Sequence, residues 1–197
     1  MDVFAARERQ GEARATRPGL AHTPAIRRAR EDELGAIAAL FPPALAPYRG
    51  TSADPVLDAY LDELVRGVRS RAQGGKCYVA VTAGRIVGSV VFYDDVTLEG
   101  WSNLPAGWAG FRALVVDPKA RGAGVGRALV EHCLMRARET GASVLGIHTA
   151  DVLSDAVRLY ERLGFVRCPE HDLSAAVAFP VDTPDDVAAI AFRYDLS

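Results

Sequence analysis

The 197-residue sequence has few cysteines, and it has no apolar run near the roughly 20 residues that a membrane-spanning helix requires. Its three cysteines, Cys77, Cys133 and Cys168, are scattered and show neither a disulfide framework nor zinc-ligand spacing. No secretory signal is recognisable either. We therefore predict a protein of the reducing cytoplasm that binds no membrane and no metal.

Lysine is nearly absent as well. Only Lys76 and Lys119 occur among the 23 basic residues, and this arginine bias, together with abundant alanine, fits a GC-rich bacterial genome. The formal net charge of −2 argues against a nucleic-acid-binding protein, which would usually be strongly basic. With 49% hydrophobic residues, the chain can bury a core without the help of disulfides or metals.

The chain divides into a polar leader and one domain. Residues 1–24 are rich in arginine and lack an apolar period, so we expect a disordered arm, followed by a single domain over 25–197. In that domain, Asp32 is the expected cap of a first helix, which Pro42 should end. Asp54 is then the expected cap of a second helix.

Further along the chain, apolar spacing predicts alternating strands and helices. Val, Ile and aromatic residues favour a hairpin over 77–82 and 86–93, and a long loop over 94–109 follows it. This order predicts an α/β or α+β sheet with helices on both faces. The other expected elements are strands at 25–29, 111–116, 143–149, 165–168 and 190–196, and helices at 54–74, 124–140 and 154–163.

The most informative feature is a strand followed by a glycine-rich turn and a helix. The turn reads Arg121-Gly122-Ala123-Gly124-Val125-Gly126. At a helix start the first N–H groups have no intrahelical partner, and the helix dipole adds partial positive charge. Glycine allows a pyrophosphate to approach these groups, and Arg121 and Arg127 add charge beside them. We therefore predict a pyrophosphate site at residues 121–127.

Two common phosphate-binding motifs do not fit this turn. A P-loop requires a lysine directly after its last glycine, and none follows here. A dinucleotide-binding turn that starts at Gly122 requires a third glycine where Arg127 stands. The acidic residue expected about 20 positions later is also missing, because that region reads Val144-Leu145-Gly146.

The remaining pattern, Arg/Gln-x-x-Gly-x-Gly/Ala, resembles the coenzyme A motif of the GNAT (GCN5-related) N-acetyltransferase superfamily. Downstream, Leu159-Tyr160-Glu161-Arg162-Leu163-Gly164-Phe165 is similar to the Leu-Tyr-x-x-x-Gly-Phe signature of the family's fourth helix. The likeness spans about residues 25–196 and is sharpest over 111–165. It implies a mixed, mostly antiparallel sheet that is splayed between its fourth and fifth strands, with helices on both faces.

The resemblance also implies acetyl-coenzyme A as the acyl donor and places a role on particular residues. Tyr160 lies where relatives carry a tyrosine that protonates the departing thiolate. Its alternative interpretation is a tyrosine packed against Leu159 and Leu163. The backbone of the strand before the turn would bind pantetheine as an added strand does. The implied cofactor-binding residues are Leu114, Val115, Val116, Arg121, Gly122, Ala123, Gly124, Val125, Gly126 and Arg127.

The general base departs from the family pattern. Relatives often carry a glutamate on the strand before the turn, and Gly110 stands at that position here. Asp94, Asp95 and Glu99 follow the hairpin, and we name Glu99 as the catalytic candidate. His148 is either a second candidate base or a buried, hydrogen-bonded histidine.

Two further positions bear on the site. Many relatives have an asparagine that contacts the cofactor seven residues before the tyrosine, where this chain has Leu153. Trp101 and Trp108 either line an acceptor pocket or pack the loop onto the sheet.

We predict an N-acetyltransferase that moves acetyl from acetyl-coenzyme A to a primary amine by direct attack in a ternary complex. The alternative is a non-catalytic acyl-coenzyme A sensor, which the missing carboxylate at Gly110 keeps open. Dimers are common in such folds, so a homodimer is a further expectation. Nothing in the sequence specifies which amine is the acceptor.

Overall fold

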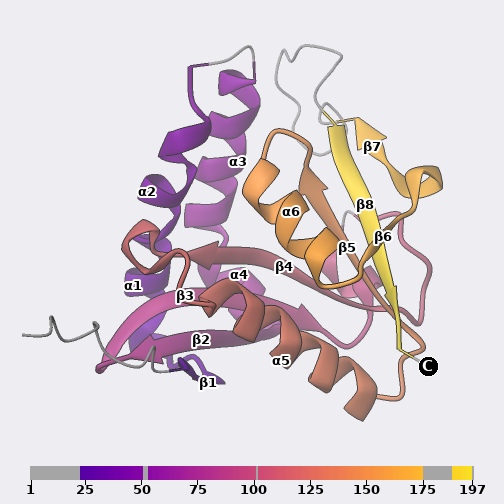
Figure 1. Ribbon diagram of the computed structural model, residues 1–197, viewed down its shortest axis with the longest axis horizontal. Helices are drawn as coiled ribbons and strands as arrows, with labels where there is room; N and C mark the ends of the chain where they lie inside the picture. Colours follow the sequence, from indigo (N-terminus) through magenta and orange to yellow (C-terminus); the bar gives the residue numbers. More distant parts are fainter. Residues whose placement is uncertain (1–22, 51–52, 101, 175–187, 197) are drawn as a thin grey trace, which may run out of the picture.

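The computed structural model describes residues 23–50, 53–100, 102–174 and 188–196 (Figure 1). Most of the predicted disordered arm and Trp101 lie outside these ranges. One eight-stranded sheet has the order β1-β2-β3-β4-β5-β8-β6, and β7 pairs with β8 beside that path. The strands are β1 (Ala25–Arg28), β2 (Lys76–Thr82), β3 (Arg85–Tyr93), β4 (Ala109–Val116), β5 (Val144–Ala150), β6 (Val166–Arg167), β7 (Leu173–Ser174) and β8 (Ala188–Asp195).

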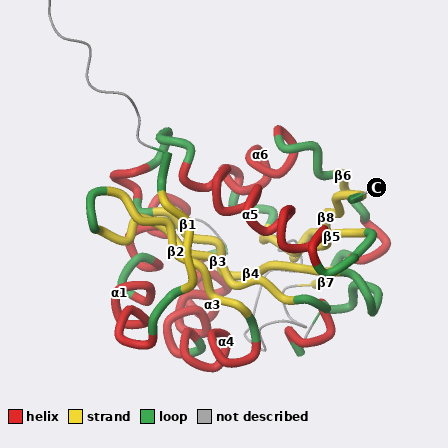
Figure 2. The backbone as a smooth tube through the Cα atoms, turned by 90° about the horizontal axis from the view of Figure 1, so that it is seen from below, coloured by secondary structure: helices red, strands yellow, loops and turns green. Residues whose placement is uncertain are grey.

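Helices cover both faces of this sheet. Figure 2 shows α1, α3 and α4 on one side of the strands and α5 and α6 on the other. The α-helices are α1 (Leu34–Ala38), α2 (Phe41–Leu45), α3 (Asp54–Arg66), α4 (Val68–Gly74), α5 (Val125–Glu139) and α6 (Ser154–Arg162). Short 3-10 turns are η1 (Glu31–Glu33), η2 (Ala46–Tyr48), η3 (Val96–Glu99), η4 (Pro118–Ala120) and η5 (Pro169–His171). Within the described ranges, no helix has both the length and the apolar character needed to cross a bilayer.

Each face of the sheet has its own hydrophobic core, as strand alternation requires. In β2, Cys77 and Val79 face the core beneath α1–α4, whereas Tyr78 and Ala80 face the core beneath α5 and α6. All strand pairs are antiparallel except β4 with β5, which are parallel. The predicted mixed, mostly antiparallel sheet with helices on both faces is therefore confirmed.

The predicted hairpin is confirmed, with a two-residue turn between β2 and β3. Ala83 has φ +49° and Gly84 has φ +76°, which are the left-handed values that match the twist of a tight hairpin. An alanine in this conformation is unusual, and the flanking strands hold it there.

The first helical region differs from the prediction. Pro42 and Pro43 do not end a helix; they occupy the first turn of α2, where a proline lacks only an N–H that would have no partner. Asp54 is not a cap either, since Ala53 is the N-cap of α3 and the Asp54 carboxylate accepts the Gly50 N–H at 3.0 Å. The predicted second helix is two helices, because the chain breaks at Gly67.

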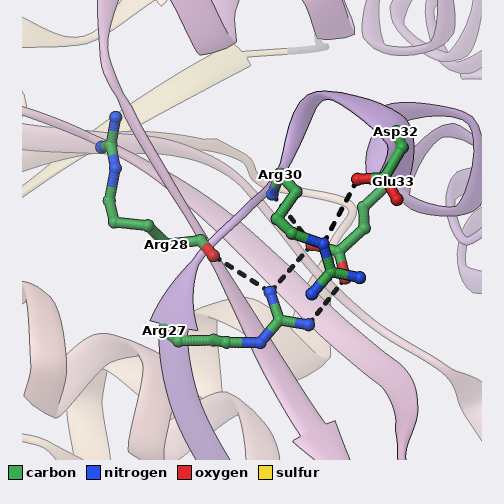
Figure 3. A network of polar contacts seen from close by, with 5 residues as sticks. All are labelled: Arg27, Arg28, Arg30, Asp32 and Glu33. Atoms are coloured by element: carbon green, nitrogen blue, oxygen red, sulfur yellow. Dashed lines mark hydrogen bonds and ion pairs between the residues drawn. The ribbon is translucent and has the colours of Figure 1, made fainter.

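A buried carboxylate joins β1 to the first helical turns (Figure 3). Glu33 is only 7% exposed and accepts hydrogen bonds from both terminal nitrogens of Arg27, at 2.6 and 2.8 Å, and from the Arg30 N–H at 2.8 Å. The Arg27 hydrogen bond is the main reason that the pKa of Glu33 falls to about 2. This network fixes the edge strand β1 to the helices that follow it.

Candidate active site

The sheet opens between β4 and β5 (Figure 1). Their parallel pairing covers only Ala109 with Leu145 and Gly110 with Gly146. Beyond this point β5 continues against β8 as far as Ala150, while β4 diverges from it. Over the described residues, the side of β4 that faces β5 therefore has no strand partner after Gly110, and its backbone groups can bind an extended ligand.

A cleft of about 720 Å³ lies along this opening. All the predicted cofactor-binding residues line it except Ala123. Its other walls come from segments that are distant in sequence, namely α2, η2, α3 and α6. These wall residues are Phe41, Ala44, Leu45, Tyr48, Tyr60, Leu64, Leu153, Asp155, Ala156, Leu159, Arg162 and Leu163, and Ala120 of η4 adds to the wall directly before the glycine turn.

A β-bulge in β4 changes which face its side chains occupy. Val91 of β3 pairs with Arg112 and Ser89 pairs with Val115, so β4 carries one extra residue between these pairs. Ala113 in the bulge has φ +55°. Before the bulge, Phe111 faces the α5–α6 core; after it, Val115 faces the α1–α4 core. The bulge therefore re-aims the strand where the cleft begins.

The glycine turn, residues 121–126, ends at the N-terminus of α5. Gly122 and Gly124 have φ near +78° and +79°, and Gly124 is the N-cap of the helix. An added Cβ at either position would meet nothing within 4 Å, so these glycines serve the backbone conformation and border open space. Gly126 differs, since an added Cβ would lie 3.2 Å from the Leu159 Cδ2 atom of α6.

The end of α5 that faces this space has no acidic residue in its first turn. Its first N–H groups and the helix dipole therefore form a cradle that fits an anion. The two nearby arginines already have protein partners. Arg121 donates to the Ala44 carbonyl at 2.8 Å and lies 3.4 Å from Asp155, and Arg127 pairs with Glu131 at 3.1 Å.

Tyr160 lies in the core beneath α5 and α6, with 4% of its surface exposed. Its ring packs against Phe111, Phe165 and Phe192, with centroids 5.6–6.0 Å apart. Burial raises the pKa of the phenol, and the nearby Tyr60 phenol raises it further. Tyr160 is not among the residues that line the cleft, but Tyr60 is. The structure therefore places the Tyr160 ring in the core and not in the wall of the cleft.

Glu99, at the end of η3, lies beside the position of the missing strand carboxylate. An added Cβ at Gly110 would be 3.2 Å from the Glu99 Oε1 atom. Burial raises the pKa of Glu99 to about 8, although the positive charge of Arg112 opposes this effect. Above that pH the carboxylate form predominates, and a carboxylate with this pKa is basic enough to accept a proton. Gly110 belongs to the last register pair between β4 and β5, so Glu99 lies near the point where the two strands part.

The other candidate bases have structural partners. Asp94 pairs with Lys76 at 2.6 Å, and Asp95 accepts the N–H groups of Thr97 and Gly107, each at 2.8 Å. The His148 Nε2 atom lies 2.9 Å from the His171 carbonyl oxygen, and burial lowers the pKa of the ring. Of the four sequence candidates, Glu99 alone combines a raised carboxyl pKa with a position beside Gly110, although it does not itself line the cleft.

Trp108 packs the loop onto the sheet. It joins a small core with Val96, Leu104, Cys168 and Ala191, and its ring lies 5.8 Å from that of His171. Leu153 is buried at the N-cap of α6 and contributes an apolar surface to the cleft.

Several charged and phenolic groups around Glu99 are absent from the sequence-based prediction. Together with Glu99 they form what we call the Glu99 cluster: Tyr60, Glu63, Arg71, Tyr93, Glu99 and Arg112. Tyr60 recurs with apolar neighbours at helical spacing, so its pattern indicates only a core position. Arg112 interrupts an otherwise apolar strand, and this break in the pattern is the signal that could have identified it.

Comparison with known proteins places this fold and cleft in a family. Residues 36–165 match the family model described as "Acetyltransferase (GNAT) family". Over 102 residues the chain is 29% identical to streptothricin acetyltransferase from Streptomyces lavendulae, which covers 52% of this chain and 50% of that protein. The match thus spans about half the length of that relative.

Solved structures show the same fold. A GCN5-related N-acetyltransferase from Rhodopseudomonas palustris superposes with a TM-score of 0.64 and 19% identity over 91% of this chain and 99% of the other. The Salmonella typhimurium protein yncA, solved with acetyl-CoA, gives a TM-score of 0.60 and 18% identity over 89% and 95%. The chain belongs to the GNAT acetyltransferase family, whose members use acetyl-CoA.

Proposed function

We propose that this protein is an acetyl-CoA-dependent N-acetyltransferase whose acceptor is a primary amine, with a single domain over residues 25–197. The observation that carries the proposal is the opening between β4 and β5. It forms a cleft of about 720 Å³ that leads from the glycine turn along the free side of β4. Family membership supplies the reaction class.

The binding of acetyl-CoA would use backbone groups for most of its contacts. The pyrophosphate would accept hydrogen bonds from the first N–H groups of α5 within residues 121–127, where the first helical turn carries no competing carboxylate. The pantetheine would extend along Leu114, Val115 and Val116 as an added strand. Arg121 would add a positive charge once it exchanges its bond with Ala44 for one with phosphate.

In catalysis, acetyl-CoA supplies the acyl group as a thioester. The residues of this chain would transfer the protons, one from the attacking amine and one to the departing sulfur. Glu99 would remove a proton from the acceptor amine, which must be neutral before it attacks. Tyr160 would donate a proton toward the departing sulfur from the opposite face of the sheet. Its raised pKa keeps it protonated but makes it a weak acid, so its contribution would be modest.

The likeness to streptothricin acetyltransferase makes streptothricin the first acceptor to test. The panel should also contain polyamines, amino acids and peptides, because the cleft itself does not define one amine. Release of free thiol from acetyl-CoA, measured with each acceptor, tests the proposal. Turnover with at least one amine is the expected result.

A sensor would give a different outcome in the same assay. Acetyl-CoA would raise the melting temperature, as any ligand that binds the folded state does, but no amine would be acetylated. The position of Glu99 beside Gly110 favours the enzyme over the sensor, since it offers a carboxylate where the strand lacks one.

A further inference from the structure

Two charged side chains that do not line the cleft, Arg112 of β4 and Glu63 of α3, form an ion pair near Glu99. Arg112 stands two residues after Gly110 on β4, before the bulge, so both residues belong to the same face of the strand. The Arg112 Nη2 atom lies 3.1 Å from Oε2 of Glu63, and only 12% of the Arg112 side chain is exposed. The guanidinium is thus held on the same face of β4 as Gly110, where an added Cβ would be 3.2 Å from the Glu99 Oε1 atom.

Glu63 binds a second arginine with its other oxygen. Its Oε1 atom lies 2.5 Å from Nη1 of Arg71, a residue that is 6% exposed and also donates to the carbonyls of Glu63 and Leu64. Gly67, between α3 and α4, makes room for this arrangement, because an added Cβ there would collide with the Arg71 guanidinium. Two positive charges therefore share one carboxylate.

We propose that Arg112 and Glu63 are positioning residues that set the protonation of Glu99 in opposite directions. This inference rests on the proposed function, in which Glu99 acts as the base. The positive charge of Arg112 stabilises the Glu99 carboxylate and so makes the base available at lower pH. Glu63 counters part of that charge and keeps the Glu99 carboxyl basic enough to accept a proton from an amine.

The other groups around Glu99 keep a fixed charge while Glu99 titrates, so Arg112 and Glu63 are the residues whose substitution tests the inference. The phenols of Tyr60 and Tyr93 have raised pKa values, with Tyr93 at about 12, so both stay neutral while Glu99 titrates. His148 on β5 acts on Arg112 and has a lowered pKa, so it is neutral as well. Asp95, ahead of η3, is held by Thr97 and Gly107, and a lowered pKa keeps it charged throughout. Arg71 is committed to Glu63.

The test is the pH dependence of kcat/KM, together with direct titration of the Glu99 carboxyl by carbon NMR, assigned with Glu99→Gln. Arg112→Gln should raise the pKa of Glu99 by about 1 unit, because it removes the positive charge that favours the carboxylate. Arg112→Lys should restore part of the difference. Glu63→Gln should lower the pKa by a smaller amount, because it leaves Arg112 and Arg71 without their counter-charge.

Matched controls come from the exposed side of the same helix. Asp62→Asn and Arg66→Gln remove one charge each from an exposed i,i+4 ion pair on α3, and both should leave the titration of Glu99 unchanged. A merely structural role for Arg112 and Glu63 would lower stability without moving the Glu99 pKa in opposite directions. Shifts of the same sign, or no shift, would overturn the inference.

The two readouts separate this inference from the proposed function. Should Glu99→Gln keep wild-type turnover, Glu99 is not the base and the proposed mechanism fails. The NMR titration in Arg112→Gln and Glu63→Gln still reports whether the two residues control Glu99. Conversely, Glu99→Gln could be inactive while the pKa of Glu99 is unchanged in Arg112→Gln and Glu63→Gln. That result would refute the positioning role and leave the proposed function standing.

Discussion

At the glycine turn the protein presents backbone groups from one continuous stretch, residues 121–126, whereas at Glu99 it presents side chains from α3, α4, β3, η3 and β4. The turn depends on local conformation, since Gly122 and Gly124 adopt positive φ. The Glu99 cluster depends on tertiary packing, since its pKa values arise from burial and from charges remote in sequence. Substitutions should therefore separate cofactor binding from catalysis.

The largest effect is expected at the turn. Gly124→Asp should abolish measurable acetyl-CoA binding, a loss of at least about 1,000-fold in affinity, because it adds a negative charge at the anion site of α5. Isothermal titration calorimetry measures this directly. Gly124→Asn is the matched control: it tolerates the same left-handed backbone and has nearly the same shape, but it adds no charge. Equal losses in the two variants would contradict the assignment of an anion site.

The second effect concerns the base. Glu99→Gln should lower kcat by about 100-fold, within the usual range for a general base, while the affinity for acetyl-CoA stays unchanged. In the wild type, kcat/KM should rise as pH increases through about 8, because the carboxylate form is the active one. If Glu99→Gln lost both cofactor affinity and kcat, cofactor binding at the glycine turn and catalysis at the Glu99 cluster would not be separable.

The raised pKa of Glu99 also links stability to pH. Between its ordinary value of 4.5 and about 8, the folded state binds more protons at Glu99 than the unfolded state does, so this group makes stability fall as pH rises through that window. Thermal melts of the wild type and Glu99→Gln at pH 5 and pH 8 should differ most at pH 8, where the variant gains. A constant difference across this range would mean that Glu99 titrates normally.

A smaller effect is expected at Gly110. Gly110→Ala would place a Cβ 2.5 Å from the Val96 Cγ1 atom and 3.2 Å from the Glu99 Oε1 atom, so these groups must move. Stability should drop by about 1–3 kcal/mol, as for other overpacked sites, and kcat should fall several-fold. Gly35→Ala on α1 is the control, because an added Cβ there meets nothing within 4 Å.

The smallest effect is expected at Tyr160. Tyr160→Phe should lower kcat only about threefold with unchanged cofactor affinity, because a thiolate is already a fair leaving group and the buried phenol is a weak acid. Tyr194→Phe deletes the same hydroxyl on β8, where the ring contacts Phe165, and serves as the control. Turnover of Tyr160→Phe equal to that control would assign Tyr160 to the core alone.

The same contrast explains what the sequence could predict. The hairpin, the alternating elements and the glycine turn follow from short-range patterns, and the sheet confirms them. Pro42 misled because a proline fits the first turn of a helix as well as the end of one. Short β7 has too few residues for a periodic signal. The Glu63–Arg112 pair joins residues 49 positions apart, and no local pattern contains that information.

The short junction between β4 and β5 also affects where the sheet opens locally. Strands β1–β4 and β5–β8 form two ribbons that share only two register pairs, although α5 packs on both. Amide hydrogens near the junction should therefore exchange through local opening more readily than those inside either ribbon. A ligand that binds along β4 and against α6 would contact both ribbons and stabilise the junction between them. Ligand binding should then slow amide hydrogen exchange in both ribbons at once, including at residues that do not contact the ligand.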